Sequence, residues 1–134
     1  RSPNLQQVEF VATTGQSDVA APARNPPTRL TMVGLYAFGD CSNLHSVIGL
    51  EHASFSLGTI CGGAFRYCVN LTSLNFSCLA RLQSLGDWAL SSCTSLTVVD
   101  LSNSVLLEEI GDCTFQACKA LKYVRLPPKL KHIF

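Results

Sequence analysis

Seven cysteines are the residues of this sequence that could most readily do chemistry, as metal ligands, redox pairs or nucleophiles. The sequence contains no C-x-x-C pair, and four residues separate the closest two cysteines, Cys113 and Cys118. An odd total also favours free thiols over a complete disulfide framework. We therefore expect structural thiols, no metal ligands and no cofactor at the following positions: Cys41, Cys61, Cys68, Cys78, Cys93, Cys113 and Cys118.

The other residue types used in catalysis do not form a local constellation either. None of the histidines, His45, His52 and His132, shares a local constellation with a candidate acid. The adjacent carboxylates of Glu108–Glu109 should point apart in a strand or turn, and Gly62–Gly63 lacks the lysine of a phosphate-binding loop. The sequence thus predicts no catalytic residues and a protein that is not an enzyme.

Two N-x-[ST] sequons indicate candidate glycosylation sites, if the protein enters a secretory pathway. They are Asn70-Leu71-Thr72 and Asn75-Phe76-Ser77. Asn70 is the better expected acceptor, because Asn75 falls within a predicted strand. Chance sequons are common in a sequence this rich in Ser and Thr, so an unmodified surface is the alternative.

Composition excludes several classes of protein. The 134 residues carry a formal net charge of +1, which argues against nucleic acid or an anionic membrane surface as a partner. Hydrophobic residues make up 47% of the chain, so it is not disordered. No apolar run approaches the roughly 18 residues of a membrane helix, and we expect no membrane insertion. The chain opens without Met or a signal peptide, so we expect a piece of a longer protein.

A repeat supplies the positive signal. Cys41, Cys68, Cys93 and Cys118 are spaced 27, 25 and 25 residues apart. Apolar residues flank each of them at fixed offsets, eight and three residues before and three and six residues after. The length of a unit varies only in the segment after the last of these apolar residues. That segment ends each time with Leu-x-x-aliphatic. A fixed core with insertions on one side is typical of stacked repeat units that share one continuous core.

The periodicity within each unit predicts its elements. Ala37, Phe38, Cys41 and Leu44 lie on one stripe of a short helix. The alternation that follows, as in Val99-Asp100-Leu101, indicates a short parallel strand with one buried face. We expect a single domain over 1–134, with a half unit at 1–32, a long Pro-rich loop at 11–32, and units at 33–59, 60–84, 85–109 and 110–134.

These columns resemble leucine-rich repeat proteins of the BspA-like (Treponema pallidum type) subfamily. The copy that carries the resemblance best is I-G-D-C-T-F-Q-A-C-K-A-L-K-Y-V-R-L-P at 110–127. With the periodicity, the resemblance implies an α/β fold: a right-handed solenoid with a parallel concave sheet and short helices on its outer face. The family occurs on bacterial surfaces and in parasitic protists, where its members are thought to act in adhesion and protein binding.

The concave sheet is the expected recognition surface of such a solenoid. Among its outward positions, we expect the partner-binding residues to be Gln7, Glu9, Ser73, Asn75, Asp100, Tyr123 and Arg125. The alternative is a face that is merely solvated. Tyr36 and Trp88 share one column near the predicted helix start, where they could form a second contact patch or pad the helix edge.

The function predicted from these features is a protein-interaction module for an unidentified protein ligand, at the cell surface or secreted, as an adhesin or receptor-type ectodomain. An intracellular scaffold or assembly subunit is the alternative that unpaired cysteines favour. A third hypothesis is the substrate-recognition segment of a larger enzyme. Because an uncapped solenoid exposes core, we expect flanking repeats or another chain at its ends.

Overall fold

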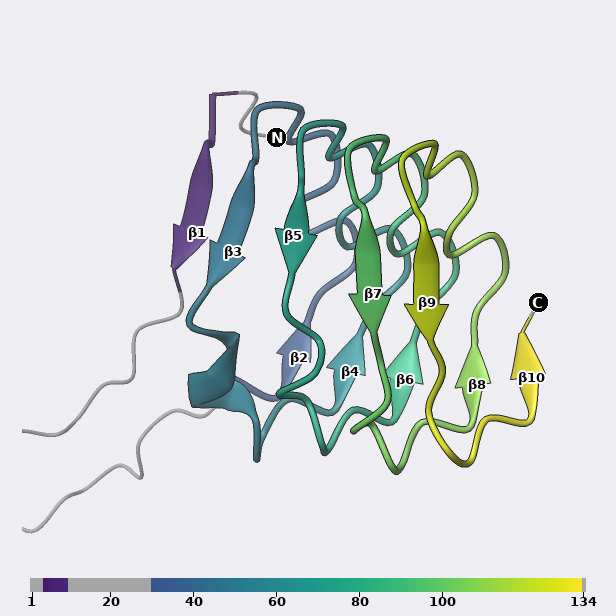
Figure 1. The fold of residues 1–134 in the computed structure, drawn as a ribbon. Coiled ribbons are helices and arrows are strands. Elements are labelled where there is room, and N and C mark those ends of the chain that lie inside the picture. The colour runs from purple at the N-terminus through teal and green to yellow at the C-terminus, as the bar shows by residue number, and fades with distance from the viewer. Residues whose placement is uncertain (1–3, 10–29, 134) are drawn as a thin grey trace, which may run out of the picture.

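The computed structural model describes residues 4–9 and 30–133, which coil into a solenoid whose short parallel strands lie on two opposite sides (Figure 1). One side holds β1 (Gln7–Glu9), β3 (Ser46–Ile48), β5 (Ser73–Leu74), β7 (Val98–Asp100) and β9 (Tyr123–Arg125). The other holds β2 (Met32–Val33), β4 (Thr59–Ile60), β6 (Ser84–Leu85), β8 (Glu109–Ile110) and β10 (His132–Ile133). We call the solvent-facing surfaces of these sets the odd-strand face and the even-strand face.

The parallel sheet expected from the alternating segments is confirmed. Strands pair β1-β3-β5 and β7-β9, all parallel, and β5 lies beside β7. Residues of one column stand in register, as in Val47 opposite Val8 and Leu74 opposite Val47. These central residues point into the core, while their neighbours along each strand point outward.

The even-numbered strands form a second parallel sheet, in the order β10-β8-β6-β4-β2. Each is two residues long and contains the aliphatic residue that closes a unit, such as Ile60 opposite Val33. The sequence pattern did not predict strands in these segments. In these strands a polar residue precedes the aliphatic one, as in Thr59-Ile60 and Ser84-Leu85. Two residues are too few to establish the period-2 pattern of a strand.

The prediction of short helices on the outer face is wrong. Within the described residues the one helical segment is a 3-10 helix, η1 (Leu50–Ala53), and the predicted helix stripe is a run of turns. We call the segments 34–41, 61–68, 86–93 and 111–118 the turn face. Alternate N–H groups bond within a turn, as Gly39 to the Tyr36 carbonyl, or to the next unit, as Phe38 to the Ala64 carbonyl.

Two residues of each turn segment have a left-handed backbone, which an α-helix cannot contain. In the first unit they are Tyr36, with φ of 50°, and Asp40, with φ of 61°. The same two columns hold Gly63 and Tyr67, then Trp88 and Ser92, then Cys113 and Ala117. A cost of about 1 kcal/mol or more per such residue is offset by the hydrogen bonds that the turns make between units.

The core lies between the two sheets and the turn face. It includes one apolar column from each sheet, the Ala, Phe and Cys columns of the turns, and two further leucine columns, one at Leu44, Leu71 and Leu96 and one at Leu57, Leu82 and Leu107. The Phe38 and Phe65 rings stack with centroids 5.2 Å apart. Phe65 is 1% exposed, whereas its counterpart in the last unit, Phe115, is only partly buried. Burial is therefore deepest in the middle units, which have neighbours on both sides.

The first unit has two extra residues, and η1 accommodates them. Gly49, with φ of 79°, follows β3 directly and turns the chain into η1, whose Leu50 and Ala53 are buried. The Pro-rich loop predicted at 11–32 lies outside the described residues except for its last three residues. The predicted unit boundaries stay predictions.

The stacked core predicts a strong contrast between two phenylalanines. Phe65→Asp places an unpaired charge in a site that is 1% exposed, so it should cost more than about 4 kcal/mol of unfolding free energy. Phe55→Asp is the matched control, because Phe55 is 80% exposed and its replacement should change stability by less than about 0.5 kcal/mol. Urea unfolding followed by circular dichroism measures both. Equal losses would contradict this description of the core.

Candidate functional site

The seven residues predicted to bind a partner all lie on the odd-strand face. Gln7, on β1, and Ser73, on β5, flank Ser46 in one register row. Tyr123 stands opposite Val98, and Arg125 stands opposite Asp100. Glu9, like Gln7, lies on β1, and β3 separates both from β5. The sheet thus holds the predicted residues in two groups rather than in one continuous patch.

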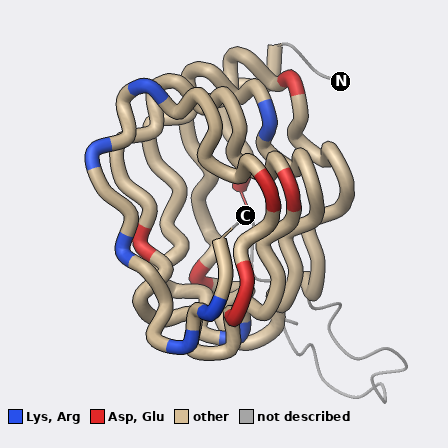
Figure 2. The backbone as a smooth tube through the Cα atoms, turned by 90° about the vertical axis from the view of Figure 1, so that its right-hand side faces the viewer, with Lys and Arg blue, Asp and Glu red and all other residues tan. Residues whose placement is uncertain are grey.

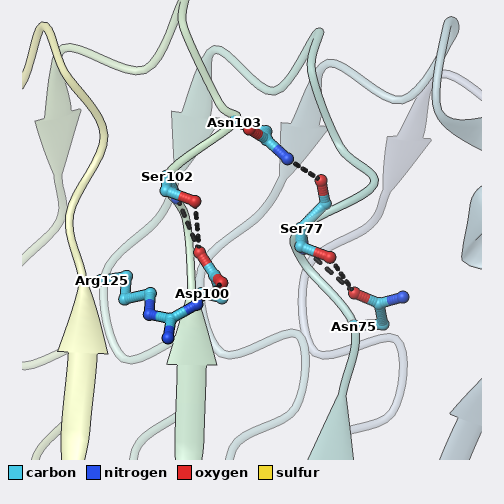
Figure 3. A network of polar contacts seen from close by, with 6 residues as sticks. All are labelled: Asn75, Ser77, Asp100, Ser102, Asn103 and Arg125. Atoms are coloured by element: carbon cyan, nitrogen blue, oxygen red, sulfur yellow. Dashed lines mark hydrogen bonds and ion pairs between the residues drawn. The ribbon is translucent and has the colours of Figure 1, made fainter.

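Three of them form a contact cluster on β7 and β9. The Arg125 Nη1 lies 3.0 Å from the Asp100 Oδ2, and its guanidinium carbon lies 5.8 Å from the centre of the Tyr123 ring. The Ser102 hydroxyl and N–H both donate to the Asp100 Oδ1, at 2.6 and 3.0 Å (Figure 3). The Ser102 hydrogen bonds, together with Arg125, hold the pKa of Asp100 below its ordinary value. Asp100 is therefore ionised and fixed in orientation at neutral pH.

The preceding unit repeats this turn with a neutral side chain. The Ser77 hydroxyl and N–H donate to the Asn75 Oδ1, at 2.6 and 3.2 Å, as the Ser102 groups do to Asp100. Asn103 joins the two turns, because its Nδ2 donates to the Ser77 carbonyl at 2.9 Å (Figure 3). Asn75 and Asp100 thus present their side chains in a defined orientation at the end of neighbouring strands.

A hollow of about 510 Å³ lies on this face over β3, β5 and β7. Ser73, Asn75 and Asp100 contribute to its lining, so the structure brings together three residues that the sequence analysis singled out separately. Gln7, Glu9, Tyr123 and Arg125 are not part of this lining.

The hollow lies where the sheet is interrupted. Thr72 N–H donates to the His45 carbonyl, and Lys122 N–H to the Thr97 carbonyl, but no such bond joins Thr97 to Thr72 in the described part of the chain. β5 stops after Leu74, and the Phe76 N–H turns back to the Leu74 carbonyl at 3.1 Å. The shortened strand leaves room that a full ladder would fill.

The walls of the hollow combine three kinds of group. Ile48 and Val98 supply aliphatic surface, and Ser73 and Asn75 supply hydroxyl and amide groups. Glu51 and Asp100 each supply a carboxylate. Seen from the end that carries β10, the backbone has both Lys or Arg and Asp or Glu positions (Figure 2). The arrangement suits a ligand that offers hydrogen-bond donors and apolar contacts together.

Sequence reasoning did not assign Glu51, Ile48 and Val98 to the site. The alternation placed Ile48 and Val98 at outward positions of strands, but they were not among the residues expected to bind a partner. Glu51 could not have been found from the pattern, because it lies in η1, the extra turn of the first unit.

The two sequons occupy different environments. The Asn70 Nδ2 donates to the Ser42 carbonyl of the preceding unit at 2.9 Å, and Asn70 is half-buried. Asn75 is exposed and lies just after β5, and its Oδ1 accepts the Ser77 bonds. The sequence analysis preferred Asn70 as the acceptor, whereas accessibility in the structure favours Asn75. Glycosylation of either residue stays a prediction.

The repeated cysteines form a ladder of thiols. All seven cysteines are free, and Cys41, Cys68 and Cys93 are buried. The Cys68 Sγ lies 3.1 Å from the Phe38 carbonyl oxygen, and the Cys93 Sγ lies 3.2 Å from that of Phe65. Burial raises the pKa of Cys68 from 9.0 to about 12 and that of Cys93 further still. These thiols are protonated hydrogen-bond donors in the core.

Two kinds of feature are absent from residues 4–9 and 30–133. No group of three or more His, Cys, Asp and Glu side chains is placed to hold a metal ion there. No helix in the same ranges has the length and apolar character needed to cross a membrane.

Comparison with known proteins agrees with this architecture. The family model for the BspA-type leucine-rich repeat region matches residues 24–134, in six copies. A leucine-rich cell surface protein from Faecalibacterium prausnitzii A2-165 has a crystal structure with a TM-score of 0.72 and 20% sequence identity to this chain. The similarity covers 97% of this chain and 38% of that protein, so the chain spans less than half of its length. None of the curated proteins matches the chain.

The thiol ladder predicts a pH dependence of stability. Because burial raises the folded-state pKa of Cys68 above 9.0, its stabilising effect is complete below pH 9.0 and is lost as pH rises toward about 12. The unfolding free energy, measured by urea titration, should therefore fall as the pH rises above 9, and it should fall less in Cys68→Ala. An identical pH dependence in the two proteins would refute the assignment of a protonated, buried thiol.

Proposed function

Because the chain belongs to the BspA-type leucine-rich repeat family, we propose that it is a protein-interaction module whose partner docks on the odd-strand face. The observation that carries this proposal is the hollow over β3, β5 and β7, which Ser73, Asn75 and Asp100 help to line. Residues on short strands of a rigid scaffold are fixed before a partner arrives, which limits the entropic cost of association. The module acts by binding and not by catalysis.

A larger hollow, of about 720 Å³, lies over β6 and β8 on the even-strand face and is the rival location. Its walls include Gly86 and Gly111, which offer no side chains, and the carboxylate of Glu108. Glu108 is already paired with the Lys131 Nζ at 2.6 Å. We favour the odd-strand hollow, because its lining includes three residues that the sequence predicts to bind a partner, Ser73, Asn75 and Asp100.

The proposed partner inserts a loop or an extended segment into the odd-strand hollow. Aliphatic side chains of that segment would contact Ile48 and Val98, and its N–H or hydroxyl groups would donate to Asn75 and Glu51. The exposed Tyr123 and Arg125 would contact the rim of the same partner, since such residues are frequent hot spots. A net charge of +1 gives little long-range steering, so shape and hydrogen bonding decide specificity.

We place the module at the cell surface, as part of an adhesin or receptor. The Faecalibacterium prausnitzii protein supports this proposal, because it has the same fold and is described as a cell surface protein. An intracellular scaffold is the second candidate, because seven free cysteines are usual in a reducing compartment. The third alternative, recognition of substrate for an attached enzyme, uses the same odd-strand face.

Both ends of the solenoid are proposed to be covered by further repeats or by another chain. At the end formed by β9 and β10, core residues such as Leu121 and Val124 are only partly buried. At the other end the same is true of Val8 and Leu30. Covering these residues would complete the burial that the middle units already have.

Site-specific photocrosslinking tests the proposed face with a matched control. Ser73 and Ser84 are both exposed serines that open two-residue strands, β5 and β6, on opposite faces. A benzoylphenylalanine at position 73, in protein returned to its native cells, should give a discrete protein adduct that excess unlabelled protein suppresses. The same group at position 84 should not. Adducts of equal yield at both positions, or an adduct at 84 alone, would overturn the proposal.

The intact mass of the native protein separates the two cellular locations. After alkylation without reduction, a surface protein with an occupied sequon should lose mass when N-glycans are removed, with the site mapped to Asn70 or Asn75. An intracellular scaffold should carry no glycan and seven alkylated thiols after denaturation. A protein without glycans and with seven alkylated thiols would contradict the proposed surface location. It would not bear on the proposed docking face, which the crosslinking experiment tests separately.

A further inference from the structure

The odd-strand hollow has two carboxylates in its lining, those of Glu51 and Asp100, and no Lys or Arg. Asp100 is already satisfied within the chain. Its Oδ2 pairs with the Arg125 Nη1 at 3.0 Å, and its Oδ1 accepts two hydrogen bonds from Ser102. The charge of Arg125, on the neighbouring strand β9, therefore offsets that of Asp100. Glu51 is the carboxylate that leaves the hollow negatively charged.

Glu51 reaches the hollow from η1, the extra turn of the first unit, and is exposed. Within residues 4–9 and 30–133, no cation forms an ion pair with its carboxylate. Burial raises the pKa of the Cys78 thiol, and the negative charge of Glu51 adds to the increase. Cys78 belongs to the turn after β5, where its Sγ lies 3.1 Å from the Asn75 carbonyl oxygen. Glu51 thus brings its charge to the turn that carries Asn75.

The strands supply the other walls of the hollow. Ile48, on β3, and Val98, on β7, present aliphatic side chains. Ser73, on the intervening strand β5, presents an exposed hydroxyl group. The hollow therefore combines an aliphatic surface with a hydroxyl group and a carboxylate that has no cationic partner among the described residues.

This combination narrows the chemistry of the group that the hollow can bind. Two carboxylates repel an anion, and a purely apolar group would desolvate Glu51 without offering it a partner. The side chain of lysine or arginine meets both conditions, because its methylene stem packs on apolar surface while its head stays charged and partly hydrated. A volume of about 510 Å³ is ample for one such side chain.

We propose that the partner of the odd-strand face inserts a lysine or arginine side chain into this hollow. Its cationic head pairs with Glu51 and donates to the Ser73 hydroxyl, while its stem packs on Ile48 and Val98. This inference rests on the proposed function and narrows the partner to a protein with an exposed basic side chain beside apolar ones. Because Glu51 is exposed, the ion pair stays open to solvent and should change affinity about threefold.

Two peptides that differ in one charge test the basic anchor. They are acetyl-Leu-Arg-Leu-amide and the same peptide with citrulline, which has nearly the shape of arginine and no charge. NMR titration of the folded protein with the arginine peptide should shift the Ser73 and Asn75 amides, with a dissociation constant of about 10 mM or below. The citrulline peptide should bind about threefold more weakly. Equal binding of the two peptides, or no shifts on the odd-strand face, would overturn the proposal.

A matched pair of variants assigns the preference for arginine to one carboxylate. Glu51→Gln removes the charge at an exposed position and should bind the two peptides equally. Glu109→Gln changes an exposed glutamate on β8, on the even-strand face, and should keep the preference. A preference that survives in Glu51→Gln, or that is lost in Glu109→Gln, would contradict the proposal. Binding of n-propylguanidinium as tight as that of the arginine peptide would also overturn it, since the occupant would then be a small cation.

Crosslinking from position 73 distinguishes a failure of this inference from a failure of the proposed function. Glu51→Gln should lower the yield of the protein adduct formed at position 73 in the native cells, whereas Glu109→Gln should not. An adduct of undiminished yield in Glu51→Gln would refute the basic anchor and leave the docking face intact. No adduct from position 73 in the unmodified background would refute the docking face itself.

Discussion

The structure depends on one constraint: each turn segment must hydrogen-bond to the next in register. Three N–H groups of one unit, those of Tyr36, Phe38 and Asp40, donate to three carbonyls of the following unit, and the pattern recurs twice more along the chain. Register can be kept only if the segment has the same length in every unit. That requirement explains why the spacing from Val33 to Val47 recurs unchanged in the later units, while the rest of each unit varies.

The length of a unit varies only in the part that the hydrogen bonds between turn segments do not constrain. The candidate binding surface lies in that part. The extra residues of the first unit become η1, which brings Glu51 to the hollow. The early end of β5 opens the space beside β7, and the Asn75–Ser77 and Asp100–Ser102 turns fix the side chains at its edge. The proposed recognition surface is thus built on loops that a repetitive frame holds in place, as is common in scaffold proteins.

The sequence predicted the columns, the parallel sheet and the outward positions, because period-2 alternation and fixed spacing report directly on burial. It failed at the turn face, since a stripe at Ala37, Phe38, Cys41 and Leu44 fits both a helix and a pair of stacked turns. Nothing in residues such as Tyr36, Trp88 and Ser92 signals a left-handed backbone. The odd-strand hollow was equally hidden, because it results from a missing hydrogen bond between strands and not from a residue type.

The most direct test of the central claim is the detection of hydrogen bonds by NMR, through scalar couplings across the bond from amide nitrogen to carbonyl carbon. The account predicts couplings between units, from Phe38 to Ala64, from Phe65 to Ala89 and from Leu90 to Thr114. Helices on the outer face would instead give couplings from each of these amides to the residue four positions earlier. That second pattern would contradict the stacked-turn frame on which the rest of the structure rests.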